Sequence, residues 1–407
     1  MRPDRRVAVT GVGIVSALGT GYAAHTESLR EGRCGIAPIT RFDTDRLMIK
    51  IAAEAKQFEG DDHFAKNELA LLDRISQMAL VAAAEAVGQS GIDFAGDLGP
   101  RTATIIGTAM GGLQTQDENY YAVYHEMKNR VHPFIVPRLM ANAPVSQISM
   151  KYGLKGPAFS VSTACSSSNH AIGQAFHLVR SGAVDAAVTG GTESVLCFGG
   201  MKAWEGLRVM SNDACRPFSR TRNGMVLGEG AAILVLEELG RARARGAPIL
   251  GEIVGFGMTA DAGDIVQPAL EGASGAMRMA LADGGVDRQE IGYINAHGTG
   301  TALNDRVEAA AIRSVLGAHS RDVLVSSTKS MHGHPIGAAG AMEAVAVLMA
   351  LGEGVVPPTI GFEEPDPEIG LDIVPNTARE ARVEAALSNS FAFGGLNAVL
   401  AFRRWNG

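Results

Sequence analysis

One cysteine stands where a nucleophile is expected. Cys165 follows a predicted strand over residues 158–163 and opens a predicted helix that ends near residue 180. The unpaired N–H groups and the dipole of a helix N-terminus stabilise a thiolate, which predicts a lowered pKa for this thiol. The same N–H groups can bind the oxyanion formed in acyl transfer. The alternative is a small buried hydrophobic residue, the favoured interpretation for Cys34, Cys197 and Cys215.

Two histidines occupy similar positions later in the chain. His297 and His334 each follow a predicted strand and lie in a glycine-containing turn. A lone histidine is usually a surface or core residue, but two at strand ends favour a functional site. His332 lies close enough to His334 for a metal pair. We expect no metal, because no carboxylate or third histidine follows at ligand spacing.

A lysine and a glutamate accompany His334. Lys329 shares its turn, and Glu343 lies on the predicted helix that follows. If buried, this pair could set the protonation state of a nearby histidine, whereas a solvated surface pair would contribute little. A cysteine with two histidines on an α/β sheet indicates nucleophilic acyl transfer through a thioester. The residues alone leave the substrate undefined.

Glycine-rich segments could also bind phosphate. Residues 10–13 and 190–191 are rich in glycine but lack the spacing of dinucleotide-binding and P-loop motifs. Nucleotide binding is therefore only weakly indicated.

The elements that must position these residues alternate along the chain. Short β-branched runs alternate with alanine-rich helical stretches, which predicts an α/β fold with a buried, largely parallel sheet. Strands are predicted at residues 7–10, 102–107, 158–163, 186–190, 231–237, 249–257, 291–295 and 323–326, with a final pair around residues 388–397. Helices are predicted at residues 73–87, from about 165 to 180, at 274–283 and from about 335 to 351, and residues 10–16 are predicted to form a glycine turn.

The chain divides into two similar halves. Residues 1–247 carry the cysteine, and residues 248–407 carry the two histidines; each half repeats strand, turn and helix. This pattern indicates a duplication. The polar turns all follow predicted strands, and open α/β sheets bind ligands at the carboxyl ends of their strands.

Composition excludes several classes of protein. The 407 residues are 46% hydrophobic and 19% charged, which is untypical of disordered and fibrous chains. A net charge of −7 argues against a nucleic-acid surface, and four cysteines without a CxxC pair argue against a disulfide framework. The N-terminal apolar run is too short for a signal peptide, and Glu343 interrupts the apolar run after Gly337. We expect a cytoplasmic protein without a membrane span.

Six segments together resemble a known family. They are TGVGIVS (10–16), STACSS (162–167), RPF through VLGEG (216–230), NAHGTGT (295–301), STKSMHGHPIGAAG (327–340) and SFAFGGLN (390–397). Their order and spacing resemble the β-ketoacyl-acyl-carrier-protein synthases, elongating condensing enzymes with the thiolase fold. The resemblance covers nearly the whole chain. It implies a duplicated, layered α-β-α-β-α architecture and a homodimer.

The resemblance also implies roles for the candidate residues. An acyl-carrier-protein thioester would acylate Cys165, and the oxyanion would bind the N–H groups of Cys165 and Phe393. His297 and His334 would bind the malonyl thioester carbonyl and stabilise the enolate formed on decarboxylation. Phe393 would also gate access, and Lys329 with Glu343 would organise the histidines.

The carrier protein itself implies further contacts. Thr299 and Thr301 would bind the phosphopantetheine arm, which belongs to the carrier, so no metal or dissociable cofactor is expected. Because the carrier protein is typically acidic, a local basic patch is expected despite the negative net charge. The candidates for that patch are Lys66, Lys128, Arg130, Lys202 and Arg208.

The three reactive residues separate this chain from related enzymes. Degradative thiolases use a second cysteine near the C-terminus, and none follows Cys215; initiating synthases carry Asn at the position of His334. Chain-length-factor subunits lack the nucleophile. A malonyl decarboxylase or starter-unit loader, or a partner subunit of another ketosynthase, are the alternatives to an elongating enzyme.

Two positions depart from the general fatty-acid enzymes. His332 stands where they usually carry Thr, and Met110 occupies the acyl-pocket gate where they often carry Ile. A flexible Met could admit an unusual chain. Three stretches are closer to nodulation-type ketosynthases, which make specialised acyl chains: KAWE (202–205), CRPF (215–218) and ND (304–305).

Overall fold

The computed structural model describes residues 5–407 and contains one large mixed sheet. Its strand order is β13-β11-β10-β15-β16-β9-β1-β8-β7-β5-β6, and β2 pairs with β1. The strands are β1 (Val7–Ser16), β2 (Gly19–Thr20), β5 (Thr102–Gly107), β6 (Ala158–Val161), β7 (Ala186–Ser194), β8 (Glu229–Glu238), β9 (Gly251–Ala260), β10 (Ile291–Asn295), β11 (Leu324–Ser326), β13 (Asp372–Ile373), β15 (Ala385–Ala392) and β16 (Leu396–Arg403). The short strands β3 (Ala37–Pro38) with β4 (Ile51–Ala52), and β12 (Val355–Val356) with β14 (Arg379–Glu380), form two further pairs.

Six helices form the layers that cover the sheet or lie within its fold: α3 (Arg74–Ser90), α6 (Ala143–Tyr152), α7 (Ser167–Arg180), α10 (Leu270–Gly284), α11 (Ala302–Leu316) and α13 (Ala339–Glu353). The other helices are α1 (Tyr22–Glu31), α2 (Lys66–Leu69), α4 (Leu113–Tyr120), α5 (Ile135–Leu139), α8 (Phe198–Gly206), α9 (Leu239–Ala244) and α12 (Lys329–His332).

The sheet contains the same strand pattern twice. In the order β6-β5-β7-β8-β1, the first two pairings are parallel and the last two antiparallel; β11-β10-β15-β16-β9 repeats this arrangement. The two copies join where β1 pairs antiparallel with β9. The prediction of a largely parallel sheet is therefore wrong, because β-branched runs indicate burial but do not determine strand direction.

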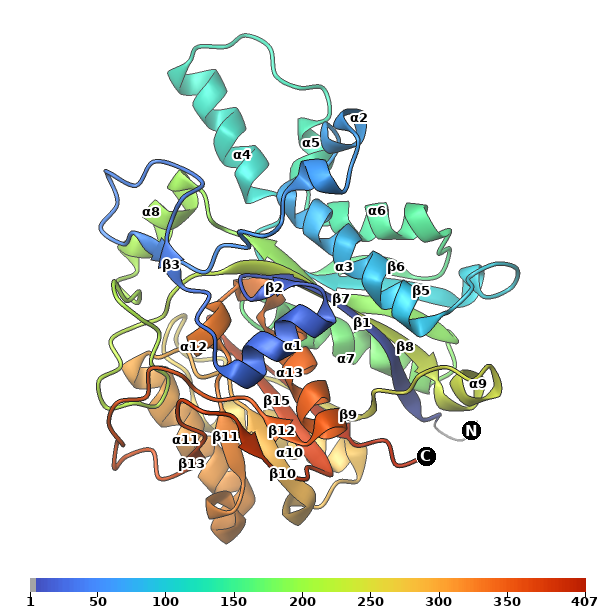
Figure 1. Cartoon of the computed structure of the whole chain (residues 1–407), viewed down its shortest axis with the longest axis vertical. Helices are drawn as coiled ribbons and strands as arrows, with labels where there is room; N and C mark the ends of the chain where they lie inside the picture. Colours follow the sequence, from blue (N-terminus) through green and yellow to red (C-terminus); the bar gives the residue numbers. More distant parts are fainter. Residues whose placement is uncertain (1–4) are drawn as a thin grey trace.

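Helices α7 and α13 lie between the two five-strand copies, and further helices cover their outer faces. Helices α7 and α13 contact each other; α7 also packs on β5 and β7, and α13 packs on β15 and β8. The pair α3 and α6 covers one outer face, whereas α10, with α11 beside it, covers the other (Figure 1). This arrangement confirms the predicted α-β-α-β-α layering.

The predicted glycine turn at residues 10–16 is wrong, because β1 continues through these residues to Ser16. A Cβ atom on Gly11 would lie 2.0 Å from the carbonyl oxygen of Ala86, and one on Gly13 would lie 2.0 Å from that of Ala82. Helix α3 thus packs directly on the backbone of β1. These glycines serve close helix–strand packing rather than a turn or a phosphate site.

Among residues 5–407, one segment is long and apolar enough to cross a membrane, but it lies in the core. It spans Ile336–Glu353, and 89% of it is buried within the protein. Helix α13, which forms most of this segment, is enclosed between the two parts of the sheet. Its apolar character therefore reflects burial on all sides.

Candidate active site

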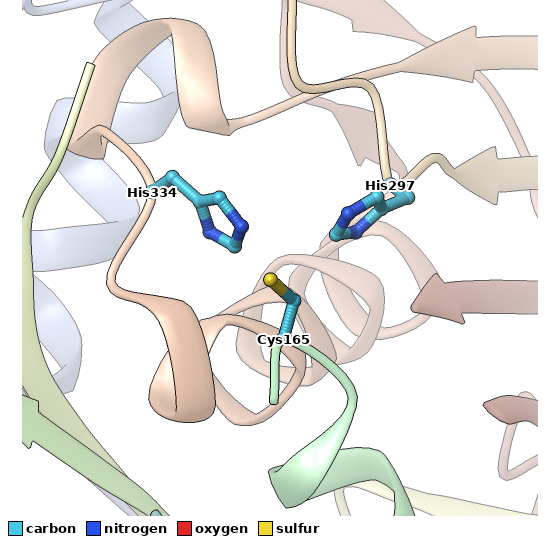
Figure 2. A group of neighbouring side chains, drawn as sticks. All are labelled: Cys165, His297 and His334. Atoms are coloured by element: carbon cyan, nitrogen blue, oxygen red, sulfur yellow. The ribbon is translucent and has the colours of Figure 1, made fainter. Parts of the chain in front are cut away.

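The ends of four strands bring the predicted site residues together. Cys165 lies between β6 and α7, His297 follows β10, Phe393 follows β15, and α12 after β11 leads to His334. The Sγ atom of Cys165 and one ring nitrogen from each histidine lie within 4.8 Å of one another, and all three residues are buried. Figure 2 shows the two imidazole rings on either side of the sulfur.

A strained turn presents Cys165. Ala164 adopts a positive φ of 49°, which is unusual for a residue with a side chain. The Ser167 hydroxyl donates to the carbonyl oxygen of Ala164 at 2.7 Å and accepts from the N–H of Thr163 at 2.9 Å. These bonds hold the turn, and the Cys165 sulfur is directed toward the two histidines (Figure 2).

The prediction of a low pKa for this thiol is wrong. Burial raises the pKa of Cys165 to about 12, although the Lys329 charge and the N–H groups of Phe393 and Cys165 act in the opposite direction. A helix N-terminus lowers the pKa of a thiol, but here the loss of water around the buried sulfur has the larger and opposite effect. Cys165 is therefore a protonated thiol at neutral pH.

Lys329 and Glu308 fix the position of His297. The buried carboxylate of Glu308 accepts from the N–H groups of His297 and Gly298, both at 2.8 Å. The Lys329 ammonium donates to Nδ1 of His297 at 3.3 Å and to its carbonyl oxygen at 2.6 Å. An ammonium can only donate, so Nδ1 is the acceptor and Nε2 carries the ring proton.

The remaining bond of Lys329 is to Glu343. These two side chains are fully buried and form an ion pair, so the ammonium has three acceptors for its three donors. Burial raises the pKa of Glu343, and Lys329 opposes that shift. The sequence left open a solvated surface pair, and the structure shows a buried one.

Both imidazoles of the site are neutral. Burial, and next the charge of Lys329, lower the pKa of His297 and of His334 well below the usual value. Within residues 5–407, neither ring nitrogen of His334 has a hydrogen-bond partner. Neutral imidazoles can donate to an oxygen that becomes negative during a reaction.

A cavity of about 150 Å³ opens on these residues. Thr299 and Thr301 line it, and their hydroxyl oxygens lie 2.9 Å apart. Phe393 also lines it, in a turn where Gly394 and Gly395 adopt positive φ angles. The rest of the lining is Cys165, Val209, Met225, Val266, Pro268, His297, Leu303, Asn304, His334, Phe391 and Ala392.

Met110 lies apart from this cavity. Its side chain is 47% exposed in the single chain and does not belong to the cavity lining. Its N–H donates to the buried carboxylate of Glu193. A role in gating the acyl pocket therefore requires something outside the single chain to cover Met110.

Sequence reasoning missed three residues around the site. Glu308 holds the His297 turn, and the Glu193 carboxylate accepts from the N–H groups of Ala109 and Gly337. Trp204 of α8 stacks on Phe393 with ring centroids 6.2 Å apart. The two glutamates carried no signal because a lone Glu in a helix or strand is normally exposed.

Comparisons with known proteins identify the family. The Beta-ketoacyl synthase N-terminal domain matches residues 4–242, and the C-terminal domain matches residues 250–363. The chain belongs to the β-ketoacyl synthase family. It is 46% identical to nodulation protein E of Rhizobium sp. (strain N33), covering 98% of this chain and 100% of the relative. It is 41% identical to 3-oxoacyl-[acyl-carrier-protein] synthase 2 of Staphylococcus aureus (strain N315), with both chains fully covered.

Solved structures of this family share the fold. The ishigamide ketosynthase/chain length factor superposes with a TM-score of 0.94 at 38% identity, covering 99% of this chain and 100% of the other. A type II PKS ketosynthase in complex with its acyl-carrier protein gives 0.90 at 28% identity, with the same coverage. This β-ketoacyl synthase thus has the thiolase-like fold and is an acyl-transferring condensing enzyme.

Proposed function

We propose that this β-ketoacyl synthase elongates an acyl chain by condensing it with a malonyl group on an acyl carrier protein. The observation that carries the proposal is the convergence of one buried thiol and two neutral imidazoles on a single cavity. A partner subunit without catalysis would not require all three groups.

In the first step, the sulfur of Cys165 attacks the carbonyl carbon of the acyl thioester. The carbon–sulfur bond to the carrier breaks, and the thiol proton passes to the departing phosphopantetheine sulfur. The N–H groups of Cys165 and Phe393, which favour negative charge at this sulfur, would bind the oxyanion. Thr299 and Thr301 would bind the phosphopantetheine arm along the cavity.

In the second step, the malonyl thioester loses carbon dioxide and leaves an enolate. The Nε2–H of His297 and a ring N–H of His334 would donate to the enolate oxygen. The enolate carbon then attacks the acyl carbonyl, the bond to Cys165 breaks, and the sulfur takes up one proton. Lys329 would support this step by keeping the His297 proton on Nε2.

The same geometry favours chemistry without a metal or a dissociable cofactor. The ammonium of Lys329 lies 3.3 Å from Nδ1 of His297, and a second cation beside it would be repelled. The phosphopantetheine arrives with the carrier protein as part of the substrate.

An acidic carrier protein would dock near the cavity mouth. Lys202 lies on α8, the helix whose Trp204 stacks on Phe393, and exposed Arg208 precedes the cavity residue Val209. These two are the best placed of the predicted basic residues. The others, Lys66, Lys128 and Arg130, are exposed on segments that contribute no residue to the cavity lining.

A second copy of the chain would cover an exposed apolar surface at one edge of the sheet and form a homodimer. Strand β6 is the last strand of the large sheet, and the side chain of Phe159 on it is 41% exposed. The segment between β5 and β6 also exposes large apolar side chains: Met110, Tyr120, Tyr121, Tyr124, Met127, Val131, Phe134, Val136, Met140 and Met150. A second copy paired on this edge would cover such a surface and Met110 with it.

The physiological substrate would be a specialised acyl chain made in the cytoplasm. The similarity to nodulation protein E supports this branch.

The test mixes the protein with acyl-carrier proteins of graded chain length and with malonyl-carrier protein, and measures both products. Elongation predicts one 3-oxoacyl-carrier protein for each carbon dioxide released. Carbon dioxide without the 3-oxoacyl product would indicate a decarboxylase, and neither product would indicate a partner subunit.

A further inference from the structure

His332 is a buried histidine that the proposed mechanism does not use. It ends helix α12, two residues before His334, and its side chain is completely buried. Its Nδ1 lies 2.9 Å from the carbonyl oxygen of Gly333, and its Nε2 lies 2.9 Å from Oγ1 of Thr328. A carbonyl oxygen only accepts, so Nδ1 donates, and a neutral ring then accepts at Nε2 from the Thr328 hydroxyl. Burial lowers the pKa of His332 well below its usual value, which agrees with a neutral ring.

The bond to Gly333 holds the peptide that leads into His334. In this peptide the carbonyl of Gly333 accepts from His332, and the N–H of His334 donates to the carbonyl oxygen of Val226 at 2.7 Å. Gly333 has a φ of 66°, and a Cβ atom there would lie 2.8 Å from the Cβ of Ala53. Both polar groups of the peptide are thus fixed, in a turn that requires glycine.

The backbone matters because the His334 ring packs edge-on against His297 but has no hydrogen bond that orients it within residues 5–407. His297 has Lys329 at its second nitrogen, whereas both ring nitrogens of His334 are without a partner in the described part of the chain. An imidazole in a site is normally oriented through its second nitrogen. The direction of the His334 ring therefore follows from its backbone and its packing.

Through its Nε2 atom, His332 is connected to the ends of the strands that carry the other site residues. Thr328, which donates to His332, directly precedes Lys329 and lies 3.4 Å from the amide nitrogen of Asn295. Asn295 also donates to the hydroxyl of Tyr293 at 2.9 Å. Asn295 ends β10, so one ring links the His334 turn to the ends of β10 and β11.

We infer that His332 is a positioning residue for His334, which it serves by holding the Gly333–His334 peptide through its Nδ1–H. The inference rests on the proposed function, in which His334 acts in condensation. Loss of this bond should slow condensation and leave acylation of Cys165 nearly unchanged.

Three variants at this position separate the two bonds of the ring. In H332N the amide nitrogen takes the place of Nδ1 and can still donate to Gly333, whereas in H332Q the amide oxygen takes the place of Nε2 and can still accept from Thr328. H332A removes both bonds. We expect condensation to fall about tenfold in H332A and H332Q and to stay within about threefold of the wild type in H332N. Acylation should stay within about twofold in all three.

Two readouts decide the inference. Equal condensation by H332N and H332Q, unchanged condensation in H332A, or a matching loss of acylation would overturn it. Because H332A could unfold, the comparison of the two isosteric amides carries the test. Crystal structures of these two variants should show the His334 ring unmoved in H332N and displaced in H332Q; the same ring position in both would overturn the inference. If the wild-type protein forms no 3-oxoacyl-carrier protein, the proposed function is wrong. The position of the His334 ring in the two variant structures would still decide the role of His332.

Discussion

The ammonium of Lys329 binds both the ring and the backbone of His297, at 3.3 Å from Nδ1 and 2.6 Å from the carbonyl oxygen. One side chain thereby fixes the tautomer and the position of the His297 imidazole. The fully buried Glu343 compensates its charge. The proposed role of Lys329 in condensation and its role in stability can therefore be tested separately.

Replacing Lys329 by Met should impair both stability and condensation. The unpaired Glu343 should lower the free energy of unfolding by about 3–5 kcal/mol, because a buried charge without its partner is costly. The double variant K329M/E343M should recover most of the stability measured by denaturant unfolding. It should still condense about 100-fold more slowly, because the Nε2–H donor is no longer fixed. Wild-type condensation by the double variant would contradict the role of Lys329.

The pKa of Cys165, raised to about 12 by burial, predicts the pH dependence of its alkylation. Only the thiolate reacts, and a raised pKa keeps its fraction small at neutral pH, so the rate should rise roughly tenfold per pH unit between about pH 7 and pH 9. The exposed Cys34 is removed by C34S in every sample. Iodoacetamide labelling followed by peptide mass spectrometry gives the rate. A plateau below about pH 8 would show a lowered pKa instead.

The stack of Trp204 on Phe393 should hold the turn that supplies an oxyanion N–H. We expect W204A to reduce kcat/KM for acylation about tenfold, because the Phe393 turn loses its packing partner. W204F keeps an aromatic face and should stay within about threefold of the wild type. If both variants acylate equally well, the stack does not position the turn.

Two glycines, one in the contact between β1 and α3 and one on the exposed face of α3, provide a stability test. Gly11→Ala places a methyl group 2.0 Å from the Ala86 carbonyl oxygen, and we expect a loss of about 1–3 kcal/mol. Gly88 lies in α3 with open space around its Cβ position, so Gly88→Ala should stabilise by about 0.5–1 kcal/mol. Thermal unfolding of both variants measures the difference. A stable Gly11→Ala protein would contradict the direct packing of α3 on β1.

Much of the fold followed from local patterns. The strands β5 and β10 have the predicted bounds, and α7 ends at the predicted Arg180. The strand β1 was predicted too short because a glycine in a strand and a glycine in a turn look alike without knowledge of the helix packed on it. Strand direction was mispredicted for a similar reason, since it depends on distant pairing. The division at residues 247 and 248 remains a prediction.

The site residues were predictable as types but not in their electrostatics. Small polar motifs after strands identified Cys165, His297 and His334, which the structure brings together. The raised pKa of Cys165 arises from segments that are distant in sequence and together exclude water from its sulfur. A local sequence pattern does not indicate this burial. The same holds for Glu308, whose burial arises from three segments that meet only in the folded chain.

Elongation through Cys165 is most directly tested by following the intact mass of the protein during a chase. We expect an acyl adduct after mixing with acyl-carrier protein, and its disappearance as 3-oxoacyl-carrier protein forms on addition of malonyl-carrier protein. C165A should take up no adduct while staying folded, and H334A should form the adduct but retain it through the chase. An adduct on C165A, or condensation by H334A at the wild-type rate, would contradict the proposed roles of Cys165 and His334.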